Sequence, residues 1–446
     1  MILRGWFLFA LTSADRVLEE GLLDLESSFL QLSIENVTLT HASEVSVPWV
    51  SLGTVHMSIY LVAFLLVPLC ALAFVDPKWL LAAMITSADS ICTELPMAIF
   101  PVIAEGPVAL GALVATKPLG QLLATPLVLR FTRHREANAM KLGLLLQSAG
   151  LLLQGFTPSL GAWFAARAAQ GVGSGLVLTA NMATSSDAFQ EVKDSDSNSV
   201  DPMILVYGLL VGPVCGAPFG GVGYTIQPFL PFLFLGLAEL VLMAAVHAKF
   251  DALPSLPGTQ PILSLLQYPM ISRPIALICL VVMYIAAIQA MLYRVLEEDL
   301  ELTVGAASFT WLFQSWPAVL GMLCLGPIAQ SIGFRLIMLT GILLAGTSAL
   351  LVEESLTVLI LALVAVGLAA GAENATVPRL LENVGMRHFD APTLSNIMVL
   401  LNLGQQVGFV IGPLAGALLC HVSSFQTMCR FFGVLLLGYA LSHTAD

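Results

Sequence analysis

Two runs of glycines spaced four residues apart constrain the fold of this chain more than any other feature. They are Gly208, Gly212, Gly216 and Gly220 in the first half, and Gly404, Gly408, Gly412 and Gly416 in the second. Residues four apart lie on one stripe of a helix, and a glycine stripe lets two membrane helices touch backbone to backbone. Each glycine of the second run follows its counterpart by 196 residues (404 minus 208). The pattern therefore predicts a duplicated membrane bundle, an architecture typical of transporters.

The composition agrees with a membrane protein. Hydrophobic residues make up 58% of the 446 residues, charged residues only 10%, and the mean hydropathy is +0.91. Soluble domains carry about 25% charged residues. The net charge is −12, with the acids mostly in loops and in the N-terminal segment, so nucleic acid is not an expected partner.

Twelve apolar runs are long enough to cross a bilayer, which takes about 20 residues. We predict helices at 79–101, 107–129, 138–157, 160–183, 203–224 and 228–249, and then at 274–295, 305–331, 335–353, 356–381, 392–420 and 424–442. These helices predict an all-α integral membrane protein with two six-helix halves, 79–250 and 274–442, joined by a cytoplasmic loop at 251–273. This is the plan of the major facilitator fold.

Positive charge is distributed unevenly over the predicted loops. One set of loops carries Lys78, Arg135, Lys249, Arg335 and Arg387, among others. The opposite set carries mainly acids, with Arg294 as the exception. Because cytoplasmic loops are enriched in lysine and arginine, we predict that the first set is cytoplasmic.

The first 75 residues admit two interpretations. Residues 1–56 are acidic and include a glycosylation sequon at Asn36, and residues 57–75 form a further apolar run. One interpretation is a signal peptide, a lumenal acidic segment and one extra membrane helix. The other is an atypical N-terminus.

Motifs for metal, cofactor or nucleotide binding are absent from the sequence. The seven cysteines lie in or beside apolar helices without CxxC spacing, and no GxxxxGK[ST] loop occurs. We therefore expect no cofactor, no metal site and no enzymatic activity.

Four charged residues lie well inside predicted helices, where a charge costs roughly 2.5–3.5 kcal/mol. They are Asp89, Lys117, Arg167 and Glu373. Such residues must face a shared polar cavity or pair with one another. Asp89 and Glu373, one from each half, are candidates for binding a cation or a proton. Lys117 and Arg167 could hold an acid in one state of a transport cycle, although a permanent ion pair that only fixes packing is the alternative.

Two further buried acids are weaker candidates. Glu94 follows Asp89 by five residues, about 140° round a helix, so we expect it to face elsewhere. Glu239 lies inside the predicted sixth helix.

Several segments resemble the vesicular amine transporters, which load monoamines or acetylcholine into secretory vesicles. Similar stretches are LVATKPLGQLLATP with Lys117, FAARAAQGVGS with Arg167, and the antiporter-like GLLVGPVCGAPFGG with Pro213 and Pro218. RHFDAPTLSNIMVLLNLGQQVGFVIGPLAG, with Pro413, resembles the family's eleventh helix and the loop before it.

This resemblance implies a major facilitator transporter that exchanges lumenal protons for a cytosolic organic cation by alternating access. It implies that Asp89 binds the amine or proton, that Glu373 replaces an aspartate of the tenth helix, and that Lys117 pairs across the halves. It also implies a location in a secretory vesicle or another endomembrane. We expect the protein to be a monomer in the lipid bilayer.

The sequence departs from the family where acids are expected. Gly385 stands at one such position, with Glu382 as the nearest substitute, and Asn402 stands at another. These changes put proton coupling in doubt. Two alternatives therefore stay open: a drug-type proton-coupled exporter at the plasma membrane, and a relative that acts as a receptor or scaffold without transport.

Overall fold

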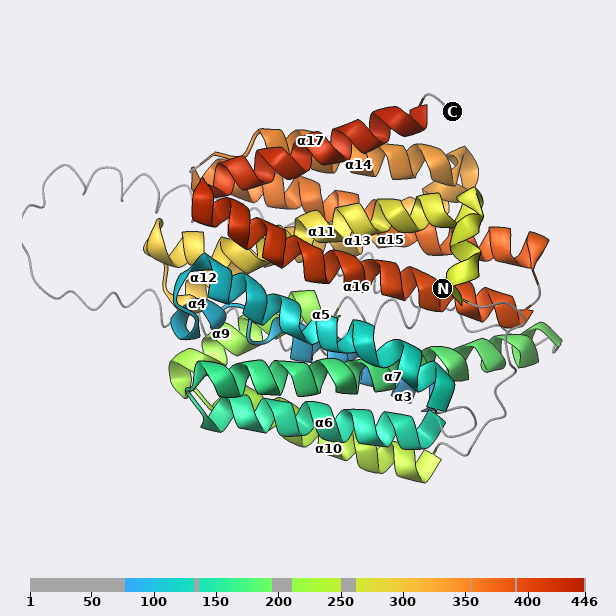
Figure 1. Ribbon diagram of the computed structural model, residues 1–446, viewed down its shortest axis with the longest axis horizontal. Coiled ribbons are helices and arrows are strands. Elements are labelled where there is room, and N and C mark those ends of the chain that lie inside the picture. The colour runs from blue at the N-terminus through green and yellow to red at the C-terminus, as the bar shows by residue number, and fades with distance from the viewer. Residues whose placement is uncertain are drawn as a thin grey trace, which may run out of the picture. The chain divides into compact units, whose positions relative to one another are not determined.

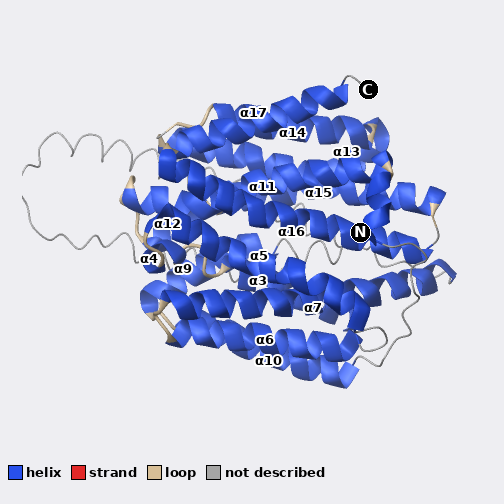
Figure 2. Cartoon of the chain, viewed as in Figure 1, coloured by secondary structure: helices blue, strands red, loops and turns tan. Residues whose placement is uncertain are grey.

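The computed structural model describes residues 77–131, 136–194, 211–249, 262–353, 355–389 and 391–444. Contacts divide the chain into residues 1–69 and 70–446, and every described residue belongs to the second unit. Within the described residues, every regular element is a helix (Figure 2). The segments predicted at 1–56 and 57–75 lie outside this part of the chain, as does Gly208.

The described helices follow most of the predicted spans, but the fourth and tenth end at Asp194 and His388 rather than at 183 and 381, and residues 203–210 of the fifth span lie outside the described residues. The N-terminal helices are α3 (Pro77–Glu94), α4 (Phe100–Ile103), α5 (Gly106–Phe131), α6 (Glu136–Phe156), α7 (Leu160–Asp194), the π-helical turn η1 (Gly212–Gly216), α9 (Ala217–Ile226) and α10 (Leu230–Lys249). The C-terminal helices are the short 3₁₀ helix η2 (Ile262–Gln267), α11 (Pro269–Glu298), α12 (Val304–Thr310), α13 (Leu312–Ile332), α14 (Phe334–Leu350), α15 (Leu356–His388), α16 (Ala391–Val422) and α17 (Phe425–Thr444). By length and composition, eight helices in the described residues can cross a membrane.

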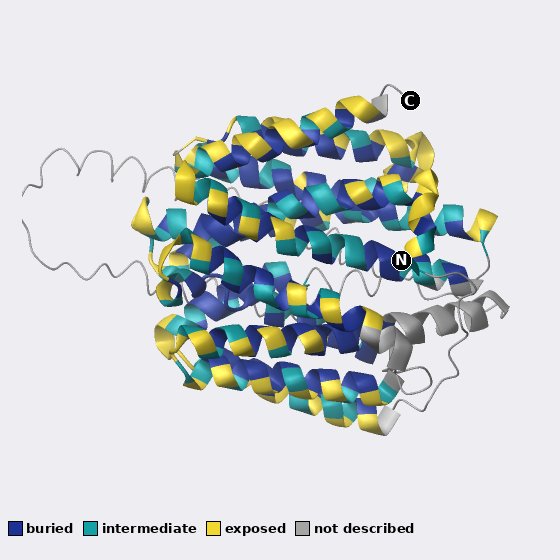
Figure 3. Cartoon of the chain, in the orientation of Figure 1, coloured by how far each residue is buried: buried dark blue, intermediate teal, exposed yellow. Residues whose placement is uncertain are grey.

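The long helices lie side by side, and α5 and α16 join the N-terminal and C-terminal helices (Figure 1). Exposed residues concentrate on the outward faces of helices (Figure 3). Many of these are large and apolar: Leu123, Val241 and Val434 expose 64%, 70% and 62% of their surface. Exposed apolar side chains on this scale suit contact with lipid.

The two glycine ladders pack equivalent helix pairs. A Cβ atom on Gly216 would lie 2.7 Å from the Cβ of Glu94, so η1 lies directly against α3. A Cβ atom on Gly408 would lie 2.6 Å from the carbonyl oxygen of Cys279, so α16 lies as closely against α11. The contact between α3 and η1, in the first and fifth predicted spans, is therefore equivalent to the contact between α11 and α16, in the seventh and eleventh.

Small residues join a second set of equivalent pairs. Gly171 of α7 meets Gly120 of α5, and Gly371 of α15 meets Gly321 of α13. The contact between α5 and α7, the second and fourth predicted spans, is therefore equivalent to the contact between α13 and α15, in the eighth and tenth. Both sets of pairs support the predicted duplication.

Two predicted helices are interrupted. We expected one helix over 79–101, but α3 ends at Glu94, since Pro96 has no N–H to donate to the carbonyl of Cys92. Residues 95–99 form turns before α4 begins. The predicted helix over 305–331 is divided at Trp311 into α12 and α13.

The N-terminal and C-terminal helices meet closely at the end predicted to be lumenal. A Cβ atom on Gly111 of α5 would lie 2.5 Å from the carbonyl oxygen of Pro413 on α16. A Cβ atom on Gly221 of α9 would lie 2.5 Å from Ser308 of α12. Both contacts leave no room for a side chain, so glycine is required for this closure.

Candidate functional site

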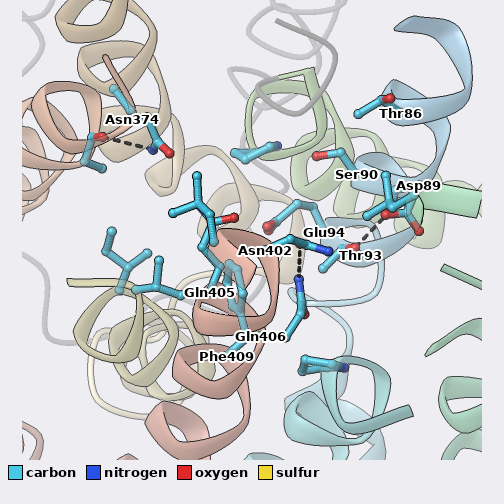
Figure 4. Close-up of a pocket in the computed structure, with 18 of the residues that line it drawn as sticks. Thr86, Asp89, Ser90, Thr93, Glu94, Asn374, Asn402, Gln405, Gln406 and Phe409 are labelled. Carbon is cyan, nitrogen blue, oxygen red and sulfur yellow. Dashed lines mark hydrogen bonds between the residues drawn. The ribbon is translucent and has the colours of Figure 1, made fainter. Parts of the chain in front are cut away.

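A cavity of about 780 Å³ lies between the N-terminal and C-terminal helices. In Figure 4, Asp89, Thr93 and Glu94 of α3 line one side and Asn402 and Gln406 of α16 line the other. The lining continues toward the predicted cytoplasmic end, where it includes Gln330, Phe334 and Asn383. The cavity therefore extends away from the end at which the two sets of helices meet.

The structure brings Asp89 and Lys117 together in the cavity wall. Lys117 Nζ lies 3.1 Å from Asp89 Oδ1, and it also donates to the Asp89 carbonyl at 2.9 Å and to Thr93 Oγ1 at 2.5 Å. Gln147 of α6 donates to the same carboxylate oxygen at 2.6 Å. Lys117 and Asp89 expose only 2% and 5% of their side chains, so this is a buried, hydrogen-bonded ion pair.

This pair differs from the one that the resemblance implies. Asp89 and Lys117 both belong to the N-terminal helices, whereas we expected Lys117 to pair across the halves. Position 402 on α16 is an asparagine, whose neutral amide cannot balance the lysine. The lysine pairs with the carboxylate of α3 instead.

Arg167 is fully buried in the same wall and compensates for the break in α3. Its Nη1 donates to the carbonyl of Cys92 and to Gln170 Oε1, both at 3.2 Å. The Cys92 carbonyl is available because Pro96 cannot donate to it. The Arg167 guanidinium also lies 5.3 Å from the centre of the Phe100 ring, a cation–π distance.

Glu94 faces the cavity, which corrects our expectation that it faces elsewhere. It lies among the lining residues and accepts a hydrogen bond from Gln289 of α11. Asp89 and Glu94 point in directions about 140° apart round α3. Both still line the cavity, because α3 packs between other cavity-lining helices on its two sides. Asp89 turns toward α5 and α6, and Glu94 turns toward α11. The sequence could have indicated Gln289, because it is a polar residue in the middle of an apolar run.

The other two acids lie behind the cavity. Glu373 is 1% exposed and is absent from the lining, where its neighbour Asn374 takes its place. A Cβ atom on Gly341 of α14 would lie 3.2 Å from Glu373 Oε1, so this carboxylate packs against α14. Glu239 is also fully buried. The oxygens of both carboxylates have no hydrogen-bond partner among the described residues.

Amides dominate the rest of the lining. The described residues contribute ten: Gln121, Asn181, Gln289, Gln314, Gln330, Asn374, Asn383, Asn402, Gln405 and Gln406. The charged lining residues are Asp89, Glu94 and Glu382, and Lys117, Arg167 and Arg379. With every acid ionised, the formal charges of these six residues cancel. Gly385 lies against Leu394, outside the cavity lining.

The antiporter-like segment contains a wide helical turn that contacts the C-terminal helices. A π-helical turn pairs each N–H with the carbonyl five residues earlier, so Pro213 would need a donor at residue 218, which is a proline. Ser315 of α13 donates to the Pro213 carbonyl instead, at 2.9 Å. Pro213 and Ser315 both line the cavity. We did not single out Ser315 from the sequence, because its partner is 102 residues away.

Comparisons with known proteins show what this chain is similar to. The family model of the Major Facilitator Superfamily matches residues 275–443. The chain is 26% identical to the chromaffin granule amine transporter of Rattus norvegicus over 344 residues, covering 75% of this chain and 65% of that protein. It is 25% identical to the vesicular acetylcholine transporter of Mus musculus over 348 residues, covering 75% and 64%. The chain thus spans just under two thirds of the length of these relatives.

Solved structures share the fold. The nucleoside transporter NupG matches with a TM-score of 0.61 at 12% identity, covering 83% of this chain and 99% of that one. A bacterial homologue of the human lysosomal transporter Spinster, in an inward-facing and unoccupied conformation, matches with a TM-score of 0.62 at 13% identity, covering 82% and 95%. The helices, the paired repeats and these matches agree with the predicted fold. This chain is a multi-pass membrane protein with the major facilitator fold; its residues 275–443 match the superfamily model, and it is distantly related to the vesicular amine and acetylcholine transporters.

Proposed function

We propose that this transporter exchanges protons for an organic cation, with a biogenic amine as the cargo class, by alternating access. The buried pair of Asp89 and Lys117 carries the proposal. A carboxylate in the cavity wall, held by a lysine, can exchange that lysine for the ammonium group of a cargo or for a proton. The distant relationship to amine and acetylcholine transporters supports the same cargo class.

Glu373 has a second role in this proposal. Its carboxylate is buried without a hydrogen-bond partner among the described residues, and an isolated charge there would be costly. We propose that Glu373 carries a proton behind the cavity. On this view Glu373→Gln weakens the dependence of uptake on the proton gradient but does not weaken the equilibrium binding of an amine.

Uptake into proteoliposomes with an acidic interior tests the proposal. The labelled solutes are serotonin, dopamine and acetylcholine, each measured with and without a protonophore. We expect uptake of at least one cation that the protonophore abolishes and that Asp89→Asn reduces at least tenfold. Glu298→Gln is the matched control, since it neutralises an exposed carboxylate of α11 that pairs with Arg294 outside the cavity.

Three outcomes would contradict the proposal in different ways. Uptake that survives collapse of the gradient would exclude proton exchange. Uptake unaffected by Asp89→Asn would exclude this site. No uptake of any cation by folded, correctly inserted protein would favour a receptor or scaffold. The compartment, proposed as a secretory vesicle or another endomembrane, is tested by locating the tagged full-length chain in cells.

One observation favours a second candidate function, the transport of a neutral polar solute. The six charged lining residues balance, and ten amides offer paired donors and acceptors. A labelled hexose and a labelled nucleoside belong in the same uptake assay. Their uptake without any uptake of cations would favour this second function.

A further inference from the structure

Arg167 presents an unused edge of its guanidinium within the cavity wall. Nη1 is occupied by Cys92 and Gln170, and the face of the group lies over Phe100. Nε and Nη2 have no hydrogen-bond partner among the described residues. These two nitrogens share one edge of the planar group, and their parallel N–H bonds match the two oxygens of a carboxylate.

The burial of Arg167 makes the unused edge informative. Arg167 lines the cavity, yet none of its surface is exposed to bulk water. Buried charged donors without acceptors are unfavourable, so an incoming acceptor with two oxygens would relieve an existing defect. Lys117 differs, because Asp89 and Thr93 already accept its hydrogen bonds.

A carboxylate interacts electrostatically with Arg167 but forms no hydrogen bond or ion pair with it among the described residues. Glu94 and Arg167 are near enough for their charges to interact, and both line the cavity. The ion pairs of the described residues do not include this pair. Glu94 instead accepts a hydrogen bond from the neutral amide of Gln289, which an ammonium group could replace.

We propose that Glu94 and Arg167 form a two-point site for a zwitterionic cargo: Glu94 binds its ammonium group and Arg167 its carboxylate. This deepens the proposed function and rests on it: the cargo still carries an ammonium group, which Glu94 binds, while Asp89 exchanges Lys117 for a proton. The added requirement is a carboxylate on the same molecule. A zwitterion also leaves the formal charge of the cavity balanced, whereas a simple cation adds one charge beside Arg167.

The alternative is an internal pair. In another state of the transport cycle, the Glu94 carboxylate itself could turn to the open edge of Arg167. Both residues would then support the protein without binding cargo. The two readings differ in whether Arg167 distinguishes cargoes with a carboxylate from cargoes without one.

Binding of three matched probes separates these readings. Phenylalanine has an ammonium and a carboxylate, 2-phenylethylamine only the ammonium, and 3-phenylpropionate only the carboxylate. Affinities are measured by calorimetry on the purified full-length chain in lipid nanodiscs. We expect phenylalanine to bind at least about tenfold more tightly than either other probe, which is the scale of one charge-assisted hydrogen bond.

The variants sharpen the test. Arg167→Lys should bring phenylalanine within about twofold of 2-phenylethylamine, because a lysine lacks the two-nitrogen edge. Glu94→Gln should weaken phenylalanine and 2-phenylethylamine at least about tenfold and leave 3-phenylpropionate unchanged. Arg294→Lys, at a partly exposed position outside the cavity, is the matched control and should change none of the three.

Each other outcome overturns a specific claim. A wild-type protein that binds 2-phenylethylamine as well as phenylalanine, or an Arg167→Lys variant that keeps the preference, overturns the two-point site and leaves amine transport standing. A wild-type protein that binds neither ammonium-bearing probe, and takes up no cation in the uptake assay, overturns the proposed function itself. If Arg167→Lys does not fold, Glu94→Gln decides: phenylalanine that still binds more tightly than 3-phenylpropionate overturns the site.

Discussion

At the scale of the residue, the ion pair of Asp89 and Lys117 shows how a charge is tolerated inside this bundle. Both side chains are almost fully buried and make several hydrogen bonds. Breaking such a pair by removing one partner typically costs about 3–5 kcal/mol, because the other charge remains buried and unpaired. The loss is much smaller when both charges are removed together.

We therefore expect Asp89→Asn alone to destabilise the protein by about 3–5 kcal/mol. The double variant Asp89→Asn with Lys117→Gln should recover most of that loss. Thermal unfolding of the wild type, the two single variants and the double variant in one detergent measures the coupling energy between the two charges. Losses that simply add in the double variant would show that the two charges do not depend on each other.

Sequence reasoning at this scale identified the charged residues but not their partners. Asp89, Lys117 and Arg167 stand out in the sequence because charges are rare in apolar helices. Their contacts depend on how different helices approach one another, and Asp89 and Lys117 are 28 residues apart. The spacing of charges does not show which face of α15 meets the cavity: a single residue turns a helix by about 100°, so Asn374 lines the cavity and Glu373 does not.

At the scale of the element, prolines redirect hydrogen bonds toward neighbouring helices. Pro96 leaves the Cys92 carbonyl to Arg167, and Pro218 leaves the Pro213 carbonyl to Ser315. The prolines were visible in the sequence, so both helix irregularities could have been predicted. The donors that replace the missing N–H groups could not, because they come from other helices.

Ser315→Ala should weaken the contact between η1 and α13. The variant leaves the Pro213 carbonyl without its side-chain donor, a loss of about 0.5–1.5 kcal/mol. Thermal unfolding measures the change. Ser331→Ala is the control on the same helix, because Ser331 is exposed and bonds only within its own turn. Equal effects of the two substitutions would count against the proposed role of Ser315.

A side chain at Gly111 should open the end predicted to be lumenal. In Gly111→Val the new atoms overlap Pro413 and Ala417 of α16, whereas Gly438→Val on α17 meets nothing within 4 Å and serves as the control. Spin labels at positions 105 and 423, in a cysteine-free background, report the distance between the start of α5 and the end of α16. We expect a longer distance in Gly111→Val only; an unchanged distance would show that the contact tolerates a side chain.

At the scale of the whole molecule, the duplicated pairs give two similar walls with different chemistry. The N-terminal helices supply Asp89, Glu94, Lys117 and Arg167, and the C-terminal helices supply eight of the ten amides. The fold and the duplication were predictable from glycine spacing and apolar runs. The amide wall was not, because its residues come from four helices and converge only in the folded protein.

The charge pattern also predicts which side of the membrane the cavity faces. Asn383→Cys, in the cavity lining, should react with a membrane-impermeant maleimide applied from the side that carries Arg335 and Arg387. Ser423→Cys, exposed between α16 and α17, should react from the opposite side. Labelling of intact and inverted vesicles, with Cys324→Ser as the background, checks both. Reaction of both positions from one side would contradict the predicted orientation.

The balance of charges around the cavity has an electrical consequence. A unit charge that crosses the membrane potential gains or loses about 2.3 kcal/mol per 100 mV. If the six lining charges move together with the acids ionised in the proposed transport cycle, reorientation of the empty protein carries no net charge through the field. Voltage would then act only on steps that carry cargo or bound protons. A zwitterion would cross with no electrical signature of its own, whereas a simple cation would generate a current in the direction of its transport.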